Sequence, residues 1–275
     1  MLVLLTLSKT SFADLIISDD FSKERLNQYD QSHIYFCNFN CGSYKAYDFL
    51  EEENGNKFIR LTSRSGQLSK FNKGQKKYLK DRIELGTKSN KLSKSWSDLE
   101  NKEIWWSFDV KLPPNFEMIN TTHITITQLK TIEKNNKNKQ CHPGMPFRIN
   151  YNDKRTWIAV TDGFNKKLKK KYIYSNMLDN SWTNFKIGYF FDKSEGWVKV
   201  FKNRKLIFDY FGNTVFDKYK KCDPVSSLKS YVRIGIYRST PVNASLSKNH
   251  KEKSDSLDFD NFYVCFGRAD CKNKF

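Results

Sequence analysis

Tyr231-Val-Arg-Ile-Gly-Ile-Tyr237 is the stretch that decides the fold, because aliphatic residues or Gly alternate in it with polar and aromatic ones. A period of two predicts a β-strand with one face against a core and the other turned away from it. Arg82-Ile-Glu84 and Gln128-Leu-Lys130 repeat the pattern over shorter lengths. The outward faces would carry Arg, Glu, Gln, Lys and Tyr side chains, which bind anions and transfer protons. These stretches therefore predict one candidate site laid across three strands.

The rest of the chain has the same short-strand character, and helical periodicity is rare. Strands are expected at Leu15–Phe21, Ile34–Phe39, Lys57–Ser63, Asp81–Gly86, Glu103–Leu112, Thr122–Lys130, Phe147–Tyr151, Thr156–Thr161, Thr183–Phe191, Trp197–Lys202, Lys205–Tyr210, Tyr231–Ser239 and Leu257–Phe266. Short strands at regular spacing predict an all-β, single-domain antiparallel β-sandwich, a jelly roll, with a concave face for a ligand.

The connections between these strands carry fewer signals. Residues 197–210 are expected to form a hairpin that turns at Asn203-Arg204. Short helical turns are expected near Leu92–Leu99 and Thr214–Lys221. The polar segments 131–142, 165–171 and 240–256 are expected to be surface loops, which often border a binding cleft in such folds.

Composition favours a folded, strongly basic protein. The 275 residues are 38% hydrophobic and 15% aromatic, enough for a sizeable core, and the net charge is +18. Such a charge favours polyanionic partners: nucleic acid, anionic lipid or acidic polysaccharide. No recognition helix, zinc finger or aromatic ribonucleoprotein motif is present, so nucleic acid is not expected as a partner. No later segment reaches the length of a membrane span, and the chain is expected to be a monomer.

The N-terminus and the cysteines both indicate export. Residues 1–13 end in Ser11-Phe-Ala13, a spacing typical of a signal-peptidase site, so the domain is expected over residues 14–275. Six cysteines in an exported chain suggest disulfides, although the sequence does not select the pairing. Location outside the cytoplasm, secreted or periplasmic, is the expectation.

The three motifs resemble those of the jelly-roll polysaccharide lyases, the group of alginate lyases, glucuronan lyase and heparin lyase I. Alginate lyases of this fold carry Arg-(Ser/Thr)-Glu-Leu, Gln-Ile-His and Tyr-Phe-Lys-Ala-Gly-x-Tyr strands in that order. The corresponding stretches here are Arg82–Leu85, Gln128–Lys130 and Tyr231–Tyr237, and Asp258–Val264 resembles the last core strand. With Asp19-Asp-Phe21 near the start, the resemblance spans nearly the whole mature chain.

The resemblance implies β-elimination on a uronate polymer: a base removes the C5 proton and the C4–O bond breaks. Arg82 and Gln128 are expected to neutralise the sugar carboxylate, since Arg offers a planar fork of donors and Gln adds a neutral one. Tyr237 is expected to transfer protons, because nearby cations favour the phenolate. The expected substrate-binding residues are Glu84, Tyr231 and Arg233, and Gly235 between the last two is expected to leave room for the ligand.

One departure from the pattern leaves the base open. The family's Gln-x-His has become Gln128-Leu-Lys130. Lys130 would act as base only if its pKa is lowered. His142, in a loop, or Tyr237 alone are the other candidates, and loss of activity is the fourth reading.

Two further readings compete with a lyase. A non-catalytic, lectin-like module that binds acidic glycans would not need the missing histidine. A glycoside hydrolase needs two carboxylates flanking the bond, and no suitable strand carries them. No cofactor or metal site is predicted, although calcium is reported in relatives and Asp20 and Asp260 offer oxygen ligands.

Overall fold

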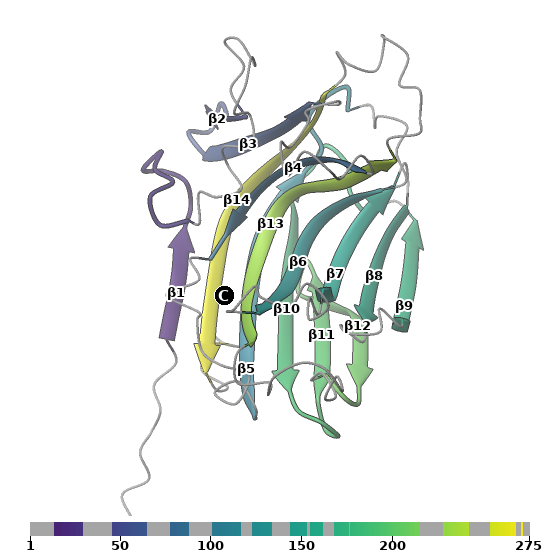
Figure 1. Cartoon of the computed structure of the whole chain (residues 1–275). Coiled ribbons are helices and arrows are strands. Elements are labelled where there is room, and N and C mark those ends of the chain that lie inside the picture. Colours follow the sequence, from purple (N-terminus) through teal and green to yellow (C-terminus); the bar gives the residue numbers. More distant parts are fainter. Residues whose placement is uncertain are drawn as a thin grey trace, which may run out of the picture.

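The structure, a computed structural model, is an antiparallel sandwich of two β-sheets (Figure 1). It describes residues 14–29, 46–64, 78–87, 101–116, 123–133, 144–152, 155–161, 168–175, 177–214, 228–241, 254–267 and 271. The sequence prediction of an all-β jelly roll is confirmed. The expected strand Ile34–Phe39, the helical turn Leu92–Leu99 and the N-terminal segment 1–13 lie outside the described residues, as does nearly all of Thr214–Lys221.

The first sheet has eight strands in the order β12-β11-β10-β5-β14-β3-β2, with β1 pairing with β14. Its strands are β1 (Asp14–Asp19), β2 (Tyr47–Glu51), β3 (Lys57–Arg64), β5 (Lys102–Lys111), β10 (Thr183–Phe191), β11 (Trp197–Lys202), β12 (Lys205–Phe211) and β14 (Ser254–Gly267). The second sheet has six strands in the order β4-β13-β6-β7-β8-β9. Its strands are β4 (Tyr78–Gly86), β6 (Ile124–Glu133), β7 (Gly144–Asn152), β8 (Arg155–Thr161), β9 (Leu168–Ser175) and β13 (Leu228–Pro241).

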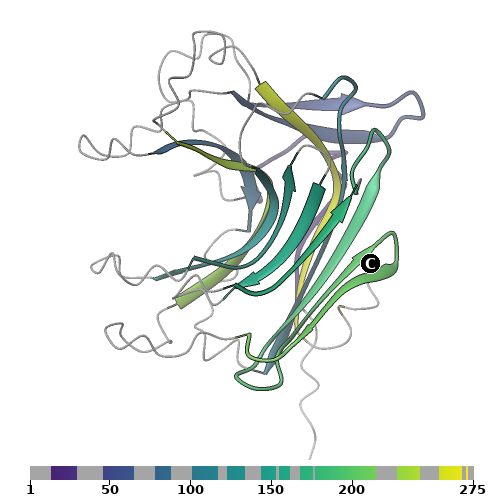
Figure 2. The ribbon, with the colours of Figure 1, turned by 90° about the vertical axis from the view of Figure 1, so that its right-hand side faces the viewer.

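The core lies between the two sheets and is built by alternation. In β13, Val232, Ile234 and Ile236 are fully buried and face the first sheet. The Trp106 ring of β5 packs edge-on against Phe147 of β7, with ring centroids 5.5 Å apart. The six-stranded sheet is strongly curved, and its concave side faces away from the first sheet (Figure 2). This curvature leaves the concave side as the open face of the sandwich.

Gly235 lies at an irregularity in the curved sheet. The register between β13 and β6 shifts between Ile234 and Tyr237, and Gly235 has a φ of +139°. A Cβ atom at this position would lie 2.3 Å from the backbone oxygen of Ile83. The backbone conformation of Gly235 and its close approach to β4 both exclude a side chain. The sequence interpretation, which assigned this glycine to leaving room for a ligand, missed this reason.

Two strands were missed from the sequence, and some boundaries were wrong. The lysine-rich stretch expected as a loop contributes to β9, an edge strand, where lysines are a common protection against further pairing. Its Tyr174 hydroxyl donates to the backbone oxygen of Ile207, which ties β9 to the other sheet. β2 was not expected either, and β6, β13 and β14 extend into segments expected to be loops. The hairpin turn is confirmed, with positive φ at Asn203 and Arg204.

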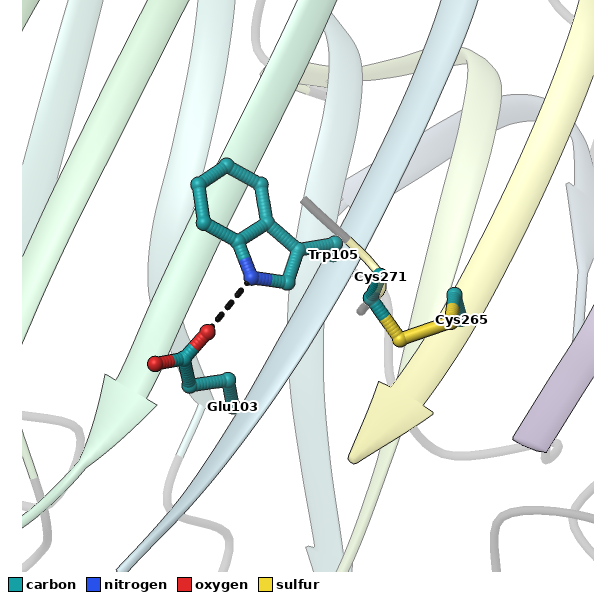
Figure 3. Close-up of a disulfide and its surroundings, with 4 residues drawn as sticks. All are labelled: Glu103, Trp105, Cys265 and Cys271. Atoms are coloured by element: carbon teal, nitrogen blue, oxygen red, sulfur yellow. Dashed lines mark hydrogen bonds between the residues drawn. A yellow bond between two sulfur atoms is a disulfide. The ribbon is translucent and has the colours of Figure 1, made fainter. Parts of the chain in front are cut away.

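A small second cluster lies on the outer face of the eight-stranded sheet. Cys265 at the end of β14 forms a disulfide with Cys271, and both pack against Trp105 (Figure 3). The Trp105 indole N–H donates to the Glu103 carboxylate over 2.7 Å. A Cβ atom on Gly188 would lie 2.6 Å from the Trp105 ring, so the glycine lets the indole lie flat on the sheet. The bridge attaches residue 271 to the last core strand.

The described residues form no helix that is long and hydrophobic enough to span a membrane.

Candidate active site

Strand register brings the predicted motifs together on the concave face. Across β4 and β13, Arg82 lies opposite Tyr237 and Glu84 opposite Gly235. Across β13 and β6, Gln128 lies opposite Arg233. Directly opposite residues in antiparallel strands point to the same side of the sheet. The three stretches therefore line one continuous face, which for Arg82 is established by the backbone alone because its side chain is not described.

The centre of this face is a buried polar network that includes Glu84, Gln128, Tyr231 and Arg233. The Arg233 guanidinium donates to Glu84 Oε2 over 3.2 Å and to the Tyr231 hydroxyl over 3.0 Å. It also lies over the Tyr231 ring, 4.4 Å from the centroid. The Gln128 amide donates to the other oxygen of Glu84. One positive and one negative charge thus neutralise each other within the sheet.

This network is nearly closed to solvent. Glu84, Gln128 and Arg233 are each only 1% exposed, and Tyr231 is 5% exposed. The sequence interpretation had placed all four on an open face in contact with substrate. Their role as catalytic or substrate-binding residues stays a prediction, but their contacts favour a supporting role. The ion pair between Arg233 and Glu84 links β13 to β4, and the other terminal guanidinium nitrogen bonds to the Tyr231 hydroxyl within β13, although the buried Arg233 Nε has no hydrogen-bond partner among the described residues.

Next to the network lies a second arginine, Arg148 of β7, directly opposite Gln128. Burial lowers the pKa of its guanidinium, whereas the nearby Tyr237 phenol raises it. Within the described part of the chain, no carboxylate forms an ion pair with Arg148. A partly dehydrated cation that no described carboxylate neutralises is an electrostatic match for an anionic ligand.

Beyond Arg148, the face continues into a group formed by His123, Trp157 and Lys171. The His123 ring packs edge-on against the Trp157 ring with centroids 5.2 Å apart. The Lys171 ammonium lies over the Trp157 ring, 5.2 Å from its centroid. The pKa of His123 is lowered by burial first, and then by the charges of Arg148 and Lys171. His123 is therefore neutral at neutral pH, and an indole beside it offers a flat platform for a sugar ring.

Asn150 lies beneath this group. It pairs with Thr125 on one side and with Trp157 on the other. The Thr125 hydroxyl donates to the Asn150 side-chain oxygen over 2.7 Å, and the buried amide nitrogen has no hydrogen-bond partner among the described residues. The pair fixes the backbone of β6 next to His123, where the register also shifts.

The remaining predicted residues are placed less directly. Tyr237 is partly buried and lies opposite both Arg82 and Thr125. Lys130 lies opposite Tyr231, six residues from Tyr237 along β13, which is about 20 Å at the usual rise of a strand. His142 lies outside the described residues. The structure therefore groups Tyr237 with Arg148 and His123, and it places Lys130 towards the other end of the face.

The sequence interpretation missed Arg148, Trp157 and His123. The alternation that singled out the three motifs is equally visible in Phe147-Arg-Ile-Asn150, where Phe147 and Ile149 are fully buried and Arg148 is not. That pattern would have placed Arg148 on the same face. Trp157 lies in an expected strand, and His123 directly precedes Ile124. The same alternation would therefore have placed both side chains on this face.

The residues named for calcium belong to a different place, the outer side of the eight-stranded sheet around Asp109 and Asp260. Both Asp109 oxygens accept from the Asn184 and Asn261 amides, at 2.6 and 2.8 Å. The Asp260 oxygens accept from the Asn56 amide and the Asn261 backbone N–H. Burial, with the charges of Asp109 and Asp20, raises the pKa of Asp260 to about 6. Among described residues, no three His, Cys, Asp or Glu side chains are arranged to hold a metal ion.

A family model described as polysaccharide lyase matches residues 39–262. Among solved structures, an endo-β-1,4-glucuronan lyase from the fungus Trichoderma reesei superposes with a TM-score of 0.53 at 12% identity, covering 91% of this chain and 95% of its own. The alginate lyase AlgAT5 of polysaccharide lyase family 7 superposes with a TM-score of 0.51 at 13% identity, covering 84% and 85%. A family 7 alginate lyase in complex with substrate gives 0.52 at 12% identity, covering 80% and 81%. No curated protein matches the chain.

Proposed function

Because the chain belongs to the polysaccharide lyase family, we propose that it cleaves a uronate-containing polysaccharide by β-elimination. The observation that carries the proposal is the pairing of Tyr237 with Arg148 on the concave face: a phenol beside a guanidinium that lacks a carboxylate partner among the described residues. The similar solved structures are a glucuronan lyase and an alginate lyase, which supports a uronate substrate.

The chemistry explains why such a pair is needed. The C5 proton of a uronate is weakly acidic while the neighbouring carboxylate carries its full charge. A cation on that carboxylate stabilises the negative charge that develops when the C5 proton leaves. The electrons of the C5–H bond then form the C4–C5 double bond, the C4–O bond breaks, and the leaving oxygen takes a proton. No water is consumed.

This chain offers residues for each requirement. Arg148 supplies a cation whose burial strengthens its interaction with a carboxylate. Arg82, opposite Tyr237 in the register, is proposed as a second donor to the same group. Tyr237 is proposed to give the proton to the leaving oxygen, because its phenol is a proton donor on the same face as Arg148. Gln128 and Glu84 are proposed to hold the sheet beneath the sugar, because they are bonded to each other and to Arg233.

Export is proposed on independent grounds. The disulfide between Cys265 and Cys271 is typical of proteins that leave the cytoplasm. The Ser11-Phe-Ala13 pattern fits removal of residues 1–13 by a signal peptidase. A polysaccharide substrate outside the cell agrees with both. Mass spectrometry of the exported protein tests this: an intact Met1 or two free thiols at residues 265 and 271 would contradict it.

A binding module is the second candidate, and one observation favours it. Lys130 stands where the related alginate lyases carry a histidine, so the strand-borne base of those enzymes is missing. A module of this kind would bind acidic glycans on the same face without cutting them.

One experiment separates the two candidates. Purified protein is incubated with alginate, glucuronan and heparin-like glycans while the ultraviolet absorbance of the unsaturated uronate product is followed. Binding of each polymer is measured in parallel. Product from any of them supports the lyase. Saturable binding without product on every polymer would contradict β-elimination and favour the binding module.

A further inference from the structure

His123 lies at the entry of β6, on the concave face, and no motif of the sequence drew attention to it. Ile124, the next residue, is fully buried in the core, and Thr125 bonds to Asn150. The ring of His123 packs against Trp157. His123 therefore shares its face with Thr125 and Trp157, which is the face that carries Arg148 and Tyr237.

The register makes His123 a diagonal neighbour of Tyr237. Tyr237 lies directly opposite Thr125, and His123 is two residues from Thr125 on the same side. Diagonal neighbours on one face have Cβ atoms roughly 7–8 Å apart, or somewhat less. At that separation the imidazole and the phenol can both reach the same glycosidic bond of a polymer lying on this face.

We propose that His123 is the base that removes the C5 proton, in place of the histidine that the Gln-x-His strand lacks. The step balances within the three residues already placed on this face. The C5 proton passes to the imidazole, the C5–H electrons form the C4–C5 double bond, and the C4–O electrons go to the leaving oxygen. That oxygen takes the Tyr237 proton, while Arg148 neutralises the carboxylate. Exchange with solvent then restores neutral His123 and the phenol.

The surroundings of His123 suit a base. Among the described residues, the charged or titratable groups facing it are Arg148 from β7, Lys171 from β9 and Tyr237 from β13, while β8 contributes the uncharged Trp157. No carboxylate of the described part contributes to its pKa. Both cations oppose protonation of the imidazole, so the free-base form is present at neutral pH. Lys130, the rival on the same strand, lies opposite Tyr231 and is remote from Tyr237 along the sheet.

The test compares His123→Gln with Lys130→Met and His142→Gln. This inference rests on the proposed lyase function, so wild-type activity on the uronate panel comes first. We expect His123→Gln to lower kcat at least about 100-fold, a typical contribution of a general base. The wild-type rate should fall as the pH drops through a value below the usual pKa of histidine, and His123→Gln should lack that acid limb. Added imidazole should restore part of the activity of His123→Ala.

The outcomes separate the two hypotheses. If the wild type never releases unsaturated product, both the lyase function and this inference fail. If the wild type and His123→Gln cleave at comparable rates, or if Lys130→Met or His142→Gln removes the acid limb instead, only the inference is overturned. Binding of the polymer and the melting temperature are measured for every variant. A His123→Gln protein that binds and melts like the wild type but does not cleave confirms the assignment.

Discussion

Arg233 and Arg148 lie on the same concave face and flank the same residue, Gln128, yet their surroundings are opposite. Arg233 is 1% exposed and bonded to Glu84 and the Tyr231 hydroxyl. Arg148 is partly buried, and no carboxylate in the described ranges neutralises it. Burial costs each cation hydration, and among the described carboxylates only Glu84 offsets that cost, at Arg233.

The difference separates support from function within one sheet. The charge of Arg233 is neutralised by Glu84 in the absence of a ligand, and both side chains are only 1% exposed, so a substrate gains little by approaching them. Around Arg148, no carboxylate of the described part of the chain supplies a counter-charge, so an anionic ligand would gain more there than at Arg233. Polar residues on a sheet face therefore divide into those that hold the sheet and those that await a ligand, and the counter-charge decides between them.

The largest effect is expected from Tyr237→Phe, on the face that carries Arg148 and His123. The phenol oxygen matters only while protons move, so kcat should fall by about 10²–10⁴ while affinity for the polymer stays near that of the wild type. Initial rates and binding isotherms on the best substrate measure both quantities. Retention of more than about a tenth of kcat would remove Tyr237 from proton transfer and move it to the supporting half of the face.

In the buried network, Arg233→Met should lower the free energy of unfolding. The substitution removes the cation that neutralises the buried Glu84 carboxylate, which typically costs about 3–5 kcal/mol in the free energy of unfolding. Denaturant unfolding of the purified protein measures the loss. The double variant Arg233→Met with Glu84→Gln is the control, because it removes both charges and should recover much of the stability. An Arg233→Met protein of wild-type stability with lost polymer binding would place Arg233 among the substrate ligands.

The same substitution at the other arginine should give the reverse result. Arg148→Met removes a cation whose charged form is disfavoured by burial, so stability should stay level or rise. Activity should suffer, with kcat lower and KM higher, by roughly 3–4 kcal/mol in transition-state stabilisation for one preorganised donor. Melting temperature and kcat/KM of the two Met variants, measured side by side, test the comparison directly. A destabilised but fully active Arg148→Met protein would show that the two arginines do not differ in the way their contacts indicate.

Much of the fold could be predicted from the sequence, because a period of two reports directly which side of a strand is buried. The alternation around Ile234 and Phe185 placed β13 and β10 in the sandwich. β9 could not be recognised in this way, because its lysines belong to an edge strand and resemble a solvated loop.

The site was less accessible from the sequence, for a physical reason. Alternation identified the face but not the partners across it: Glu84 and Arg233 are 149 residues apart in the chain. Which arginine is neutralised depends on strand order and register, which emerge only when the sheet forms. His123 could not be linked to Tyr237 from the sequence either, because the two are diagonal neighbours on strands that lie far apart in the chain.

The smallest of these effects is expected at the outer end of the functional half, from Trp157→Ala. The indole is held between the His123 ring and the Lys171 ammonium, so it is already fixed in place before a sugar arrives. Stacking of a sugar on such a ring adds mainly to ground-state binding, so KM should rise while kcat changes little. A contribution of about 1–1.5 kcal/mol corresponds to roughly a tenfold change in KM. Trp157→Phe serves as the control, because it keeps an aromatic surface and should recover part of the affinity. If Trp157→Ala instead lowers kcat and flattens the acid limb of the pH profile, the indole acts by positioning His123. Trp157 would then contribute to catalysis together with His123, Arg148 and Tyr237.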